Sequence, residues 1–394
     1  MQYGEEFFDA GIYRVGTRCE KWDGCREEHG EDTLPLWVAD MDFASPTEVR
    51  DALLARAAHA TYGYTQICPD DREALIGFWK RRHGLTVAQE DITELPCVVS
   101  GIKVAIQALT RPGDGVIIQS PVYGPFRFSV EATGRTLMDA PLRRNPDGRY
   151  DMDLDAVEQR LREGAKLMVL CSPHNPVSRL WSREELEALA ALLDRYGVPL
   201  VSDEIHADFV YAPGQFVPIL SVTKKNVMSL CAASKTFNLA GLQQAACLCP
   251  DAELREQYRR RIDHAGVTSG NIFALEGTRA AYQYGDAWLD GLMRYLEENR
   301  KCLEELVARE LPEAVLTPME ATYLAWLDLR AWGMDDEELT ARCEKAGVCF
   351  TMGGFFGNGG DGFARINIAC PRRYLPEGIR RLKNALGPIP AAGR

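Results

Sequence analysis

The sequence predicts an α/β protein in which a large domain with a mostly parallel sheet carries a smaller α+β domain. Between about residues 95 and 250, short apolar runs alternate with amphipathic stretches of helix length. Strands that alternate with helices form parallel sheets whose two faces are covered by helices. After about residue 286 the pattern changes to a long helix, a strand of alternating polarity and a glycine-rich segment. This change predicts a second domain that packs on the first.

Six apolar runs are predicted to form buried strands of the large sheet. They are residues 95–99, 116–119, 167–171, 198–201, 227–231 and 242–248. The helix after the third run is predicted to begin with a capping box, because Ser182 is followed by Glu185 and then by the apolar Leu186.

The smaller domain is predicted from the pattern in the last third of the chain. Its elements are a helix at residues 288–309, a strand at 322–328, a helix at 336–346, a glycine-rich segment at 352–362 and a strand at 363–369. We expect the large domain to span residues 46–286. We expect the small domain to combine residues 1–45 with residues 287–394.

Charge and composition exclude several classes of partner. The 394-residue chain has 45 Lys and Arg against 57 Asp and Glu, a net charge of −12, so its surface repels nucleic acid and anionic lipid. Its first residues lack the basic and apolar regions of a signal peptide, and no stretch approaches the roughly 20 apolar residues that span a bilayer. We therefore expect a cytoplasmic protein with neither nucleic acid nor membrane as a partner.

The twelve cysteines are scattered and show no paired C-x-x-C motif. Several lie in apolar runs that resemble strands, where a reduced cysteine behaves as a small hydrophobic residue. We therefore predict reduced thiols and no metal site.

Two polar segments follow neighbouring predicted strands. Asp203 lies in residues 202–206, after one strand, and Lys235 lies in residues 234–238, after the next. Because the carboxyl ends of parallel strands meet at one edge of a sheet, we expect the two side chains to lie close together. A lysine amine and an anionic partner for a pyridinium nitrogen are what pyridoxal phosphate (PLP) requires. The pair therefore predicts a PLP site.

Each of these two residues also has a simpler interpretation. Asp203 could cap a helix or pair with an arginine, and Lys235 could lie on the surface. A carboxylate at the end of a buried strand is costly unless it is paired, which favours a ligand for Asp203. Small, largely apolar residues at 231–234 precede Lys235 and favour burial, which lowers the pKa of a lysine.

Two further strand ends carry residues suited to the same cofactor. Ser100, Gly101 and Ile102 follow the first predicted strand, and backbone N–H groups at a helix start form a phosphate site. The alternative is a serine that only caps the helix. Tyr123 follows the next strand, where its ring could stack on a pyridine, although aromatic residues at such positions usually pack in the core.

Asn175 and Arg365 complete the predicted set. Asn175 can donate a hydrogen bond to a phenolic oxygen, although an asparagine before proline is also common in turns. Arg365 alternates onto one face of an otherwise apolar strand, where a planar anion such as an amino acid α-carboxylate would bind it with two hydrogen bonds. The alternative for Arg365 is a buried structural ion pair.

Together these residues resemble the fold-type-I PLP-dependent enzymes, and more closely the cystathionine β-lyase-like C–S lyases of the aminotransferase superfamily. The matching segments occur in the family's order at residues 36–43, 62–64, 120–123, 171–176, 202–206, 234–238, 321–328 and 363–367. The resemblance implies the PLP-dependent transferase fold type I. It also implies β-elimination from cystathionine or another cysteine S-conjugate, which yields pyruvate, ammonia and a thiol.

The resemblance implies a role for each candidate residue. The implied catalytic residues are Lys235, Asp203 and Tyr123. The implied cofactor-binding residues are Lys235, Asp203, Asn175, Tyr123, Ser100, Gly101, Ile102, His206, Ser234 and Tyr64. The implied substrate-binding residues are Arg365, Ala39, Tyr123 and Asn175. Tyr64 would reach the phosphate of the partner subunit, which implies a homodimer with shared active sites.

Three positions bear on the choice within the superfamily. Aminotransferases tend to carry tyrosine where this chain has His206, which favours a lyase. Ala232 stands where a serine or threonine often binds phosphate, and Ser178 where glycine is often found. Two alternatives remain open: an aminotransferase that uses the same residues, and a regulator that acts through protein contacts.

Overall fold

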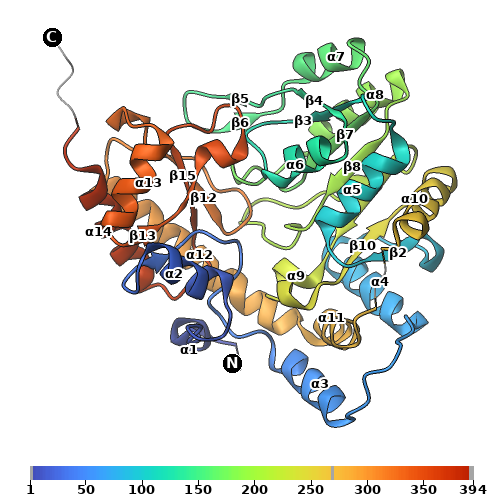
Figure 1. The fold of residues 1–394 in the computed structure, drawn as a ribbon, viewed down its shortest axis with the longest axis horizontal. Helices are drawn as coiled ribbons and strands as arrows, with labels where there is room; N and C mark the ends of the chain where they lie inside the picture. The colour runs from blue at the N-terminus through green and yellow to red at the C-terminus, as the bar shows by residue number, and fades with distance from the viewer. Residues whose placement is uncertain (1–2, 268–269, 390–394) are drawn as a thin grey trace.

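The computed structural model describes residues 3–267 and 270–389 and is built around one seven-stranded sheet (Figure 1). In spatial order its strands are β2 (Ile92–Leu95), β10 (Ala245–Leu248), β9 (Val227–Cys231), β8 (Leu200–Asp203), β7 (Leu167–Cys171), β3 (Gly115–Ile118) and β4 (Thr136–Asp139). The pairs from β9 to β4 are parallel, and β10 is antiparallel to both of its neighbours. The expectation of a mostly parallel sheet is confirmed.

Alternate residues of the strands face two separate cores, as the two-residue repeat of a strand requires. On one face, Val116 and Val169 pack under the first group of helices. On the other face, Ile117 and Met168 join the larger core. The helices of the first group are α5 (Val98–Leu109), α6 (Pro125–Ala132) and α10 (Ala252–Ala265). Other helices of this part are α3 (Thr47–Ala58), α4 (Pro69–His83), α7 (Leu154–Arg162), α8 (Arg183–Tyr196), α9 (Ala233–Thr236) and α11 (Ile272–Tyr284).

The predicted start of α8 is confirmed, and two predicted strands differ from the structure. Ser182 and Glu185 form the capping box of α8. The strand predicted at residues 95–99 is wrong, because β2 ends at Leu95 and Val98 already begins α5. The apolar residues after Leu95 continue at helical spacing, and a short apolar run does not reveal its period.

Two more differences occur at other strands of the sheet. The strand predicted at residues 242–248 begins only at Ala245, after a short 3-10 turn. Strand β4 was not predicted, because it lies at the edge of the sheet and is only partly buried.

The C-terminal part forms a second, four-stranded sheet. Its order is β11 (Val315–Leu316), β12 (Leu324–Asp328), β15 (Phe363–Asn367) and β14 (Thr351–Met352). Its helices are α12 (Asp286–Glu310), α13 (Asp336–Lys345) and α14 (Tyr374–Leu386). The remaining elements are α1 (Glu5–Ala10), α2 (Cys25–His29), β1 (Leu34–Pro35), β13 (Val348–Cys349) and the hairpin of β5 (Arg143–Arg144) and β6 (Tyr150–Asp151).

The N-terminal segment joins this second sheet region, because β1 pairs in parallel with β13. That pairing is compatible with the predicted division near residues 46 and 286, which stays a prediction. Of the helices in the described part of the chain, none has the length and apolar character needed to cross a membrane.

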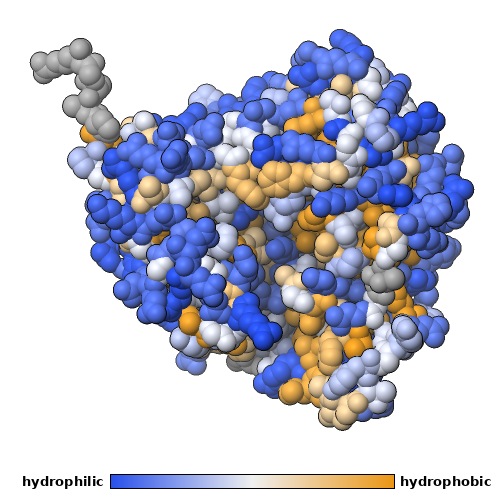
Figure 2. Space-filling view, viewed as in Figure 1, coloured by the Kyte–Doolittle hydropathy of each residue, from blue (hydrophilic) through white to orange (hydrophobic). Residues whose placement is uncertain are grey.

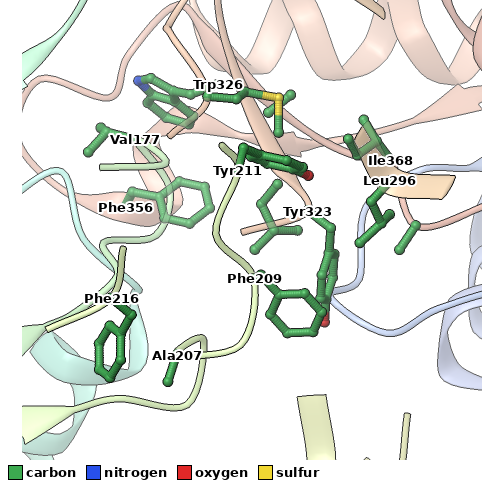
Figure 3. Close-up of a cluster of buried hydrophobic side chains, with 14 of the residues drawn as sticks. Val177, Ala207, Phe209, Tyr211, Phe216, Leu296, Tyr323, Trp326, Phe356 and Ile368 are labelled. Atoms are coloured by element: carbon green, nitrogen blue, oxygen red, sulfur yellow. The ribbon is translucent and has the colours of Figure 1, made fainter. Parts of the chain in front are cut away.

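An aromatic cluster joins the two sheets and places strand β12 beside the segment after β8 (Figure 3). Phe209 and Tyr323 meet edge to face at a centroid distance of 4.8 Å. Trp326 of β12 meets Phe356 at 5.2 Å. The backbone N–H of Thr322 also donates to the carbonyl of Phe209 at 2.8 Å. The second sheet is therefore fixed against the edge at which the parallel strands end.

Gly101 lets helix α5 approach the sheet closely. A Cβ atom at this position would lie 2.7 Å from Leu95 Cδ1 and 3.1 Å from Tyr258 Oη. We therefore expect Gly101→Val to lower the free energy of unfolding by about 1–3 kcal/mol, measured by urea denaturation. Gly63→Val is the matched control, because no atom lies within 4 Å of its added Cβ. Unchanged stability of Gly101→Val together with weaker cofactor binding would contradict this packing role.

Candidate active site

A cavity of about 160 Å³ opens at the carboxyl ends of the parallel strands, where ligands bind in such sheets. In Figure 2 the surface is hollowed near the middle of the view. Seven residues singled out from the sequence line the cavity: Ala39, Tyr123, Asn175, Asp203, His206, Ser234 and Lys235. Arg365 borders it through a hydrogen bond to Asn175. The fold therefore brings together residues that are up to about 330 positions apart in the chain.

Asp203 is the last residue of β8 and is buried. Its Oδ1 accepts a hydrogen bond from the backbone N–H of Ile205 at 3.1 Å. Burial raises the pKa of this carboxyl to about 7, although that hydrogen bond and the charge of Lys235 oppose the rise. Asp203 forms no salt bridge within residues 3–267 and 270–389, and a ring N–H donor would supply a cationic partner.

Lys235 lies in the short helix α9, which follows β9 directly. Its Nζ donates a hydrogen bond to the carbonyl oxygen of Ala39 at 2.6 Å. Burial lowers the pKa of this amine to about 8; the nearby Arg365 also lowers it, whereas Asp40 and Asp203 raise it. A larger fraction of the amine is consequently unprotonated near neutral pH than for an ordinary lysine.

Arg365 lies in β15 and is buried. One of its terminal nitrogens donates to Asn175 Oδ1 at 3.2 Å, and the other donates to the carbonyl of Trp37 at 2.9 Å. Its Nε has no hydrogen-bond partner in the described part of the protein. Burial lowers the pKa of this guanidinium to about 10. In the residues that the structure describes, Arg365 has no salt bridge, so the alternative of a structural ion pair is not what the fold provides.

His206 and Tyr123 add two groups that are neutral at physiological pH. Burial lowers the pKa of His206 to about 3, and its Nδ1 has no partner among the described residues. Burial also raises the pKa of Tyr123 above its usual value. The backbone N–H of Tyr123 donates to the carbonyl of Asn175 at 3.1 Å, which ties the ends of β3 and β7 together.

The start of α5 lines the cavity one turn earlier than the sequence analysis expected. The lining residues there are Cys97, Val98 and Val99. Ser100, Gly101 and Ile102 lie further along the helix and do not line the cavity; their cofactor roles stay predictions. The missed signal is Pro96: β2 ends just before it, and Cys97 caps the new helix by accepting from the N–H of Ser100 at 3.4 Å.

Several other lining residues were not predicted. They are Cys171, Ile205, Ala240, Gln243 and Gln244. The two glutamines follow the lysine segment, but nothing in their local sequence distinguishes them from surface residues.

Tyr64 lies outside the cavity, in a segment without regular secondary structure, with its side chain fully exposed. The local structure accommodates both residues that differ from the usual family pattern, Ser178 and Ala232. Ser178 adopts φ 56°, a conformation that favours glycine, and its hydroxyl donates to the carbonyl of Ala321. Ala232 is the buried N-cap residue of α9. Ser178 therefore bonds to the second sheet region and does not line the cavity.

The chemistry of these groups fits PLP. The buried carboxyl of Asp203 matches a ring nitrogen, and the Lys235 amine with its lowered pKa matches an aldehyde. The N-terminus of α5, which lines the cavity, matches a phosphate. The unpartnered Nε of Arg365 leaves a donor for a carboxylate beside them.

Comparison with known proteins identifies a matching family and similar proteins. The chain matches the model of the aminotransferase class I and II family over residues 31–382. It is 41% identical over 385 residues to the cystathionine beta-lyase PatB of Bacillus subtilis, which covers 96% of this chain and 99% of that protein. It is 34% identical over 384 residues to the protein MalY of Escherichia coli, with 96% and 98% covered.

Solved structures agree with these matches. The PLP-bound C–S lyase from Staphylococcus hominis aligns with a TM-score of 0.90 at 31% identity, covering 96% of this chain and 98% of that chain. The matched range of the family model includes the whole cavity from Ala39 to Arg365. The resemblance inferred from the sequence and the fold-type-I architecture are thus confirmed, and the chain belongs to the aminotransferase class I and II family.

Proposed function

We propose that this protein is a PLP-dependent C–S lyase that cleaves cystathionine or a related cysteine S-conjugate by β-elimination. The products are pyruvate, ammonia and a thiol. The observation that carries the proposal is that Lys235 and Asp203 line one cavity, which Arg365 borders through Asn175. The names of the relatives, a cystathionine beta-lyase and a C–S lyase, support the choice of reaction.

PLP is the cofactor, and the chain offers a partner for each of its parts. When bound, PLP links covalently to amines and withdraws electrons from the substrate Cα. Asp203 would hold the ring nitrogen, Asn175 the phenolic oxygen and Tyr123 the ring face. The N–H groups of residues 97–99 and the hydroxyl of Ser234 would hold the phosphate.

Arg365 and Asn175 would hold the substrate. The hydrogen bond from Arg365 fixes the oxygen of the Asn175 amide, so its Nδ2 would remain as a donor for a ligand. The unpartnered Nε of Arg365 would add a second charged donor for the α-carboxylate. The substrate Cα would thereby be oriented with its proton towards Lys235.

Lys235 and Tyr123 would move the protons of the reaction. The Nζ of Lys235 has a pKa of about 8, so it can accept the Cα proton as a free amine and release it again near neutral pH. The raised pKa of Tyr123 keeps a proton on its Oη, where it can be donated to the departing thiolate.

We also propose that the active protein is a homodimer in the cytoplasm. An apolar hollow of about 680 Å³ lies on α3 and α11, lined by Leu53, Leu54 and Phe273 among others. Figure 2 displays apolar surface over α3 at the bottom of the view. The exposed Tyr64 lies in the segment between α3 and α4 and would reach into the partner's site. Twelve free cysteines support a reducing compartment.

The first prediction tests the covalent role of Lys235. Borohydride treatment of the PLP-loaded protein should fix the cofactor mass on the peptide that contains Lys235, detected by mass spectrometry, because its amine is the reactive one in the cavity. Lys235→Ala should lose measurable turnover, whereas Lys166→Ala, at an exposed position, should retain it. A cofactor label on another lysine would remove Lys235 from the proposal.

The second prediction concerns Asp203. Its pKa of about 7 in the folded protein exceeds the ordinary aspartate value of 3.8, so this group stabilises the protein without PLP most at low pH. That contribution is lost as the pH rises from about 4 to about 7. Asp203→Asn should therefore flatten the fall of unfolding free energy between these pH values, measured by urea denaturation. The loaded variant should turn over about 10²–10³-fold more slowly.

Asp194→Asn, at an exposed ion pair with Lys225, is the control for the removal of one carboxylate. If Asp203→Asn keeps both the parental pH dependence and the parental turnover, Asp203 has no part in cofactor chemistry.

The third prediction separates lyase from aminotransferase. Both reactions begin with loss of the Cα proton, but only a β-leaving group allows elimination. With cystathionine, the loaded protein should form pyruvate, ammonia and homocysteine in equal amounts without an added keto acid. Colorimetric assays of the three products measure this ratio. If product forms only when a keto acid is supplied, and without free ammonia, the aminotransferase alternative replaces the lyase.

A further inference from the structure

A segment without regular secondary structure at residues 37–43, here named the strap, contacts the two functional cations of the site, Lys235 and Arg365. Two asparagines bind it. Asn238, three residues after Lys235, accepts from the N–H of Met41 at 3.0 Å and donates to its carbonyl at 3.0 Å. Asn367, two residues after Arg365, donates to the carbonyls of Val38 and Asp40, both at 2.6 Å. The strap is therefore fixed to the lysine segment and to the arginine strand.

Two strap carbonyls accept hydrogen bonds from these cations. Ala39 accepts from Lys235 Nζ at 2.6 Å, and Trp37 accepts from Arg365 at 2.9 Å. The hydroxyl of Tyr323 donates to the same Ala39 carbonyl at 2.9 Å, which fixes its direction. The lysine amine thus has a built acceptor outside the cofactor position.

The next strap residue, Asp40, supplies a negative charge beside this acceptor. Arg14 donates two hydrogen bonds, of 2.9 and 2.6 Å, to the carboxylate of Asp40 and also contacts Asp42 at 3.1 Å. Lys21, fully buried, pairs with Asp42 at 2.7 Å. Of the carboxylates that act on Lys235, Asp40 has the largest effect in raising its pKa against burial.

We propose that the carbonyl of Ala39 and the carboxylate of Asp40 form the holding site for the free Lys235 ammonium during turnover. Arg14 partly neutralises Asp40 and so sets how strongly the site attracts the ammonium. The inference rests on the proposed function of Lys235. As a free amine, Lys235 would accept the Cα proton on its Nζ lone pair, and the C–H electron pair would stay on carbon. The resulting ammonium needs an acceptor and a counter-charge, and the strap supplies both.

The groups of the site that face the Lys235 amine come from several elements. They act on its charge, line the same cavity or bond to the same carbonyl, and they are Asp40, Tyr123, Asp203, His206, Tyr323 and Arg365. Tyr123, Tyr323 and His206 are uncharged near neutral pH, because burial raises the tyrosine pKa values and lowers that of the histidine. Changes at Asp40 or Arg14 therefore alter the field on Lys235 directly. Asp203, whose pKa burial raises to about 7, titrates in the same range and is present in the parent and in every variant.

The test is the pKa of Lys235 in the full-length chain after removal of PLP. It is measured by competitive acetylation with acetic anhydride over a pH series, with exposed Lys166 as the internal standard. Asp40→Asn should lower the pKa of Lys235 by about one unit, because an attractive charge is lost. Arg14→Gln should raise it, because Asp40 is then no longer neutralised. Arg14→Lys should restore the parental value.

Opposite shifts distinguish the proposal from a purely structural role, since simple loosening of the strap would move both variants in the same direction. Asp9→Asn is the matched control, because it removes one N-terminal carboxylate that bonds to Tyr295 and not to the strap. Shifts of equal sign, or no shift in Asp40→Asn, overturn the proposal. If Arg14→Gln does not fold, the direction in Asp40→Asn alone decides.

A second readout uses the PLP-loaded enzyme and separates the two proposals. Asp40→Asn should lower kcat for cystathionine about tenfold and leave KM within about twofold, because Arg365 still holds the carboxylate. If the parent cleaves cystathionine through Lys235 but Asp40→Asn lowers neither the pKa of Lys235 nor kcat, only the proposal of a holding site is wrong. If the parent does not cleave cystathionine while the Lys235 pKa shifts as expected, only the proposed reaction fails.

Discussion

Two opposite charges that share a dehydrated edge of the sheet constrain the whole site. Burial raises the pKa of Asp203 to about 7 and lowers that of Lys235 to about 8, because the charged form of each group is less stable here than in water. Within the described residues they form no salt bridge with each other. A ligand with a cationic N–H and a carbonyl group relieves both penalties at once, which is why this edge suits PLP.

The order and register of the strands bring these groups to one place. Cys171, Asp203 and Leu230 are aligned on three parallel neighbours, so the segments after β7, β8 and β9 leave the sheet side by side. Asn175 and Lys235 follow within five residues of their strands. The second sheet reaches the same edge through the aromatic cluster, and thereby presents Arg365. The chemistry of the site is thus distributed over two sheets that must pack correctly before the site exists.

The sequence predicted the parts of this site that depend on strand ends. Asp203 and Lys235 could be found because buried strands are recognisable and ligands collect where parallel strands end. The start of α5 was misplaced, because two valines belong equally well to a strand and to a buried helix. Contacts such as Lys235 with Ala39 join residues 196 positions apart, and no local pattern encodes them. Tyr64 has no contact with the cavity of its own chain, so its predicted role depends on a second copy.

Family membership leaves the fate of the Cα proton open, because elimination and transamination share its removal. The outcome depends on where that proton is held while the Cβ–S bond breaks. An ammonium bound at Ala39 and stabilised by Asp40 keeps the proton on the lysine. Return of the proton is then slower, and the thiolate leaves first. The strap that holds it also contacts Arg365 through Trp37, so carboxylate binding and proton storage share one rigid segment. In this arrangement the N-terminal segment, far from the lysine in sequence, helps to set the reaction that a common set of active-site residues performs.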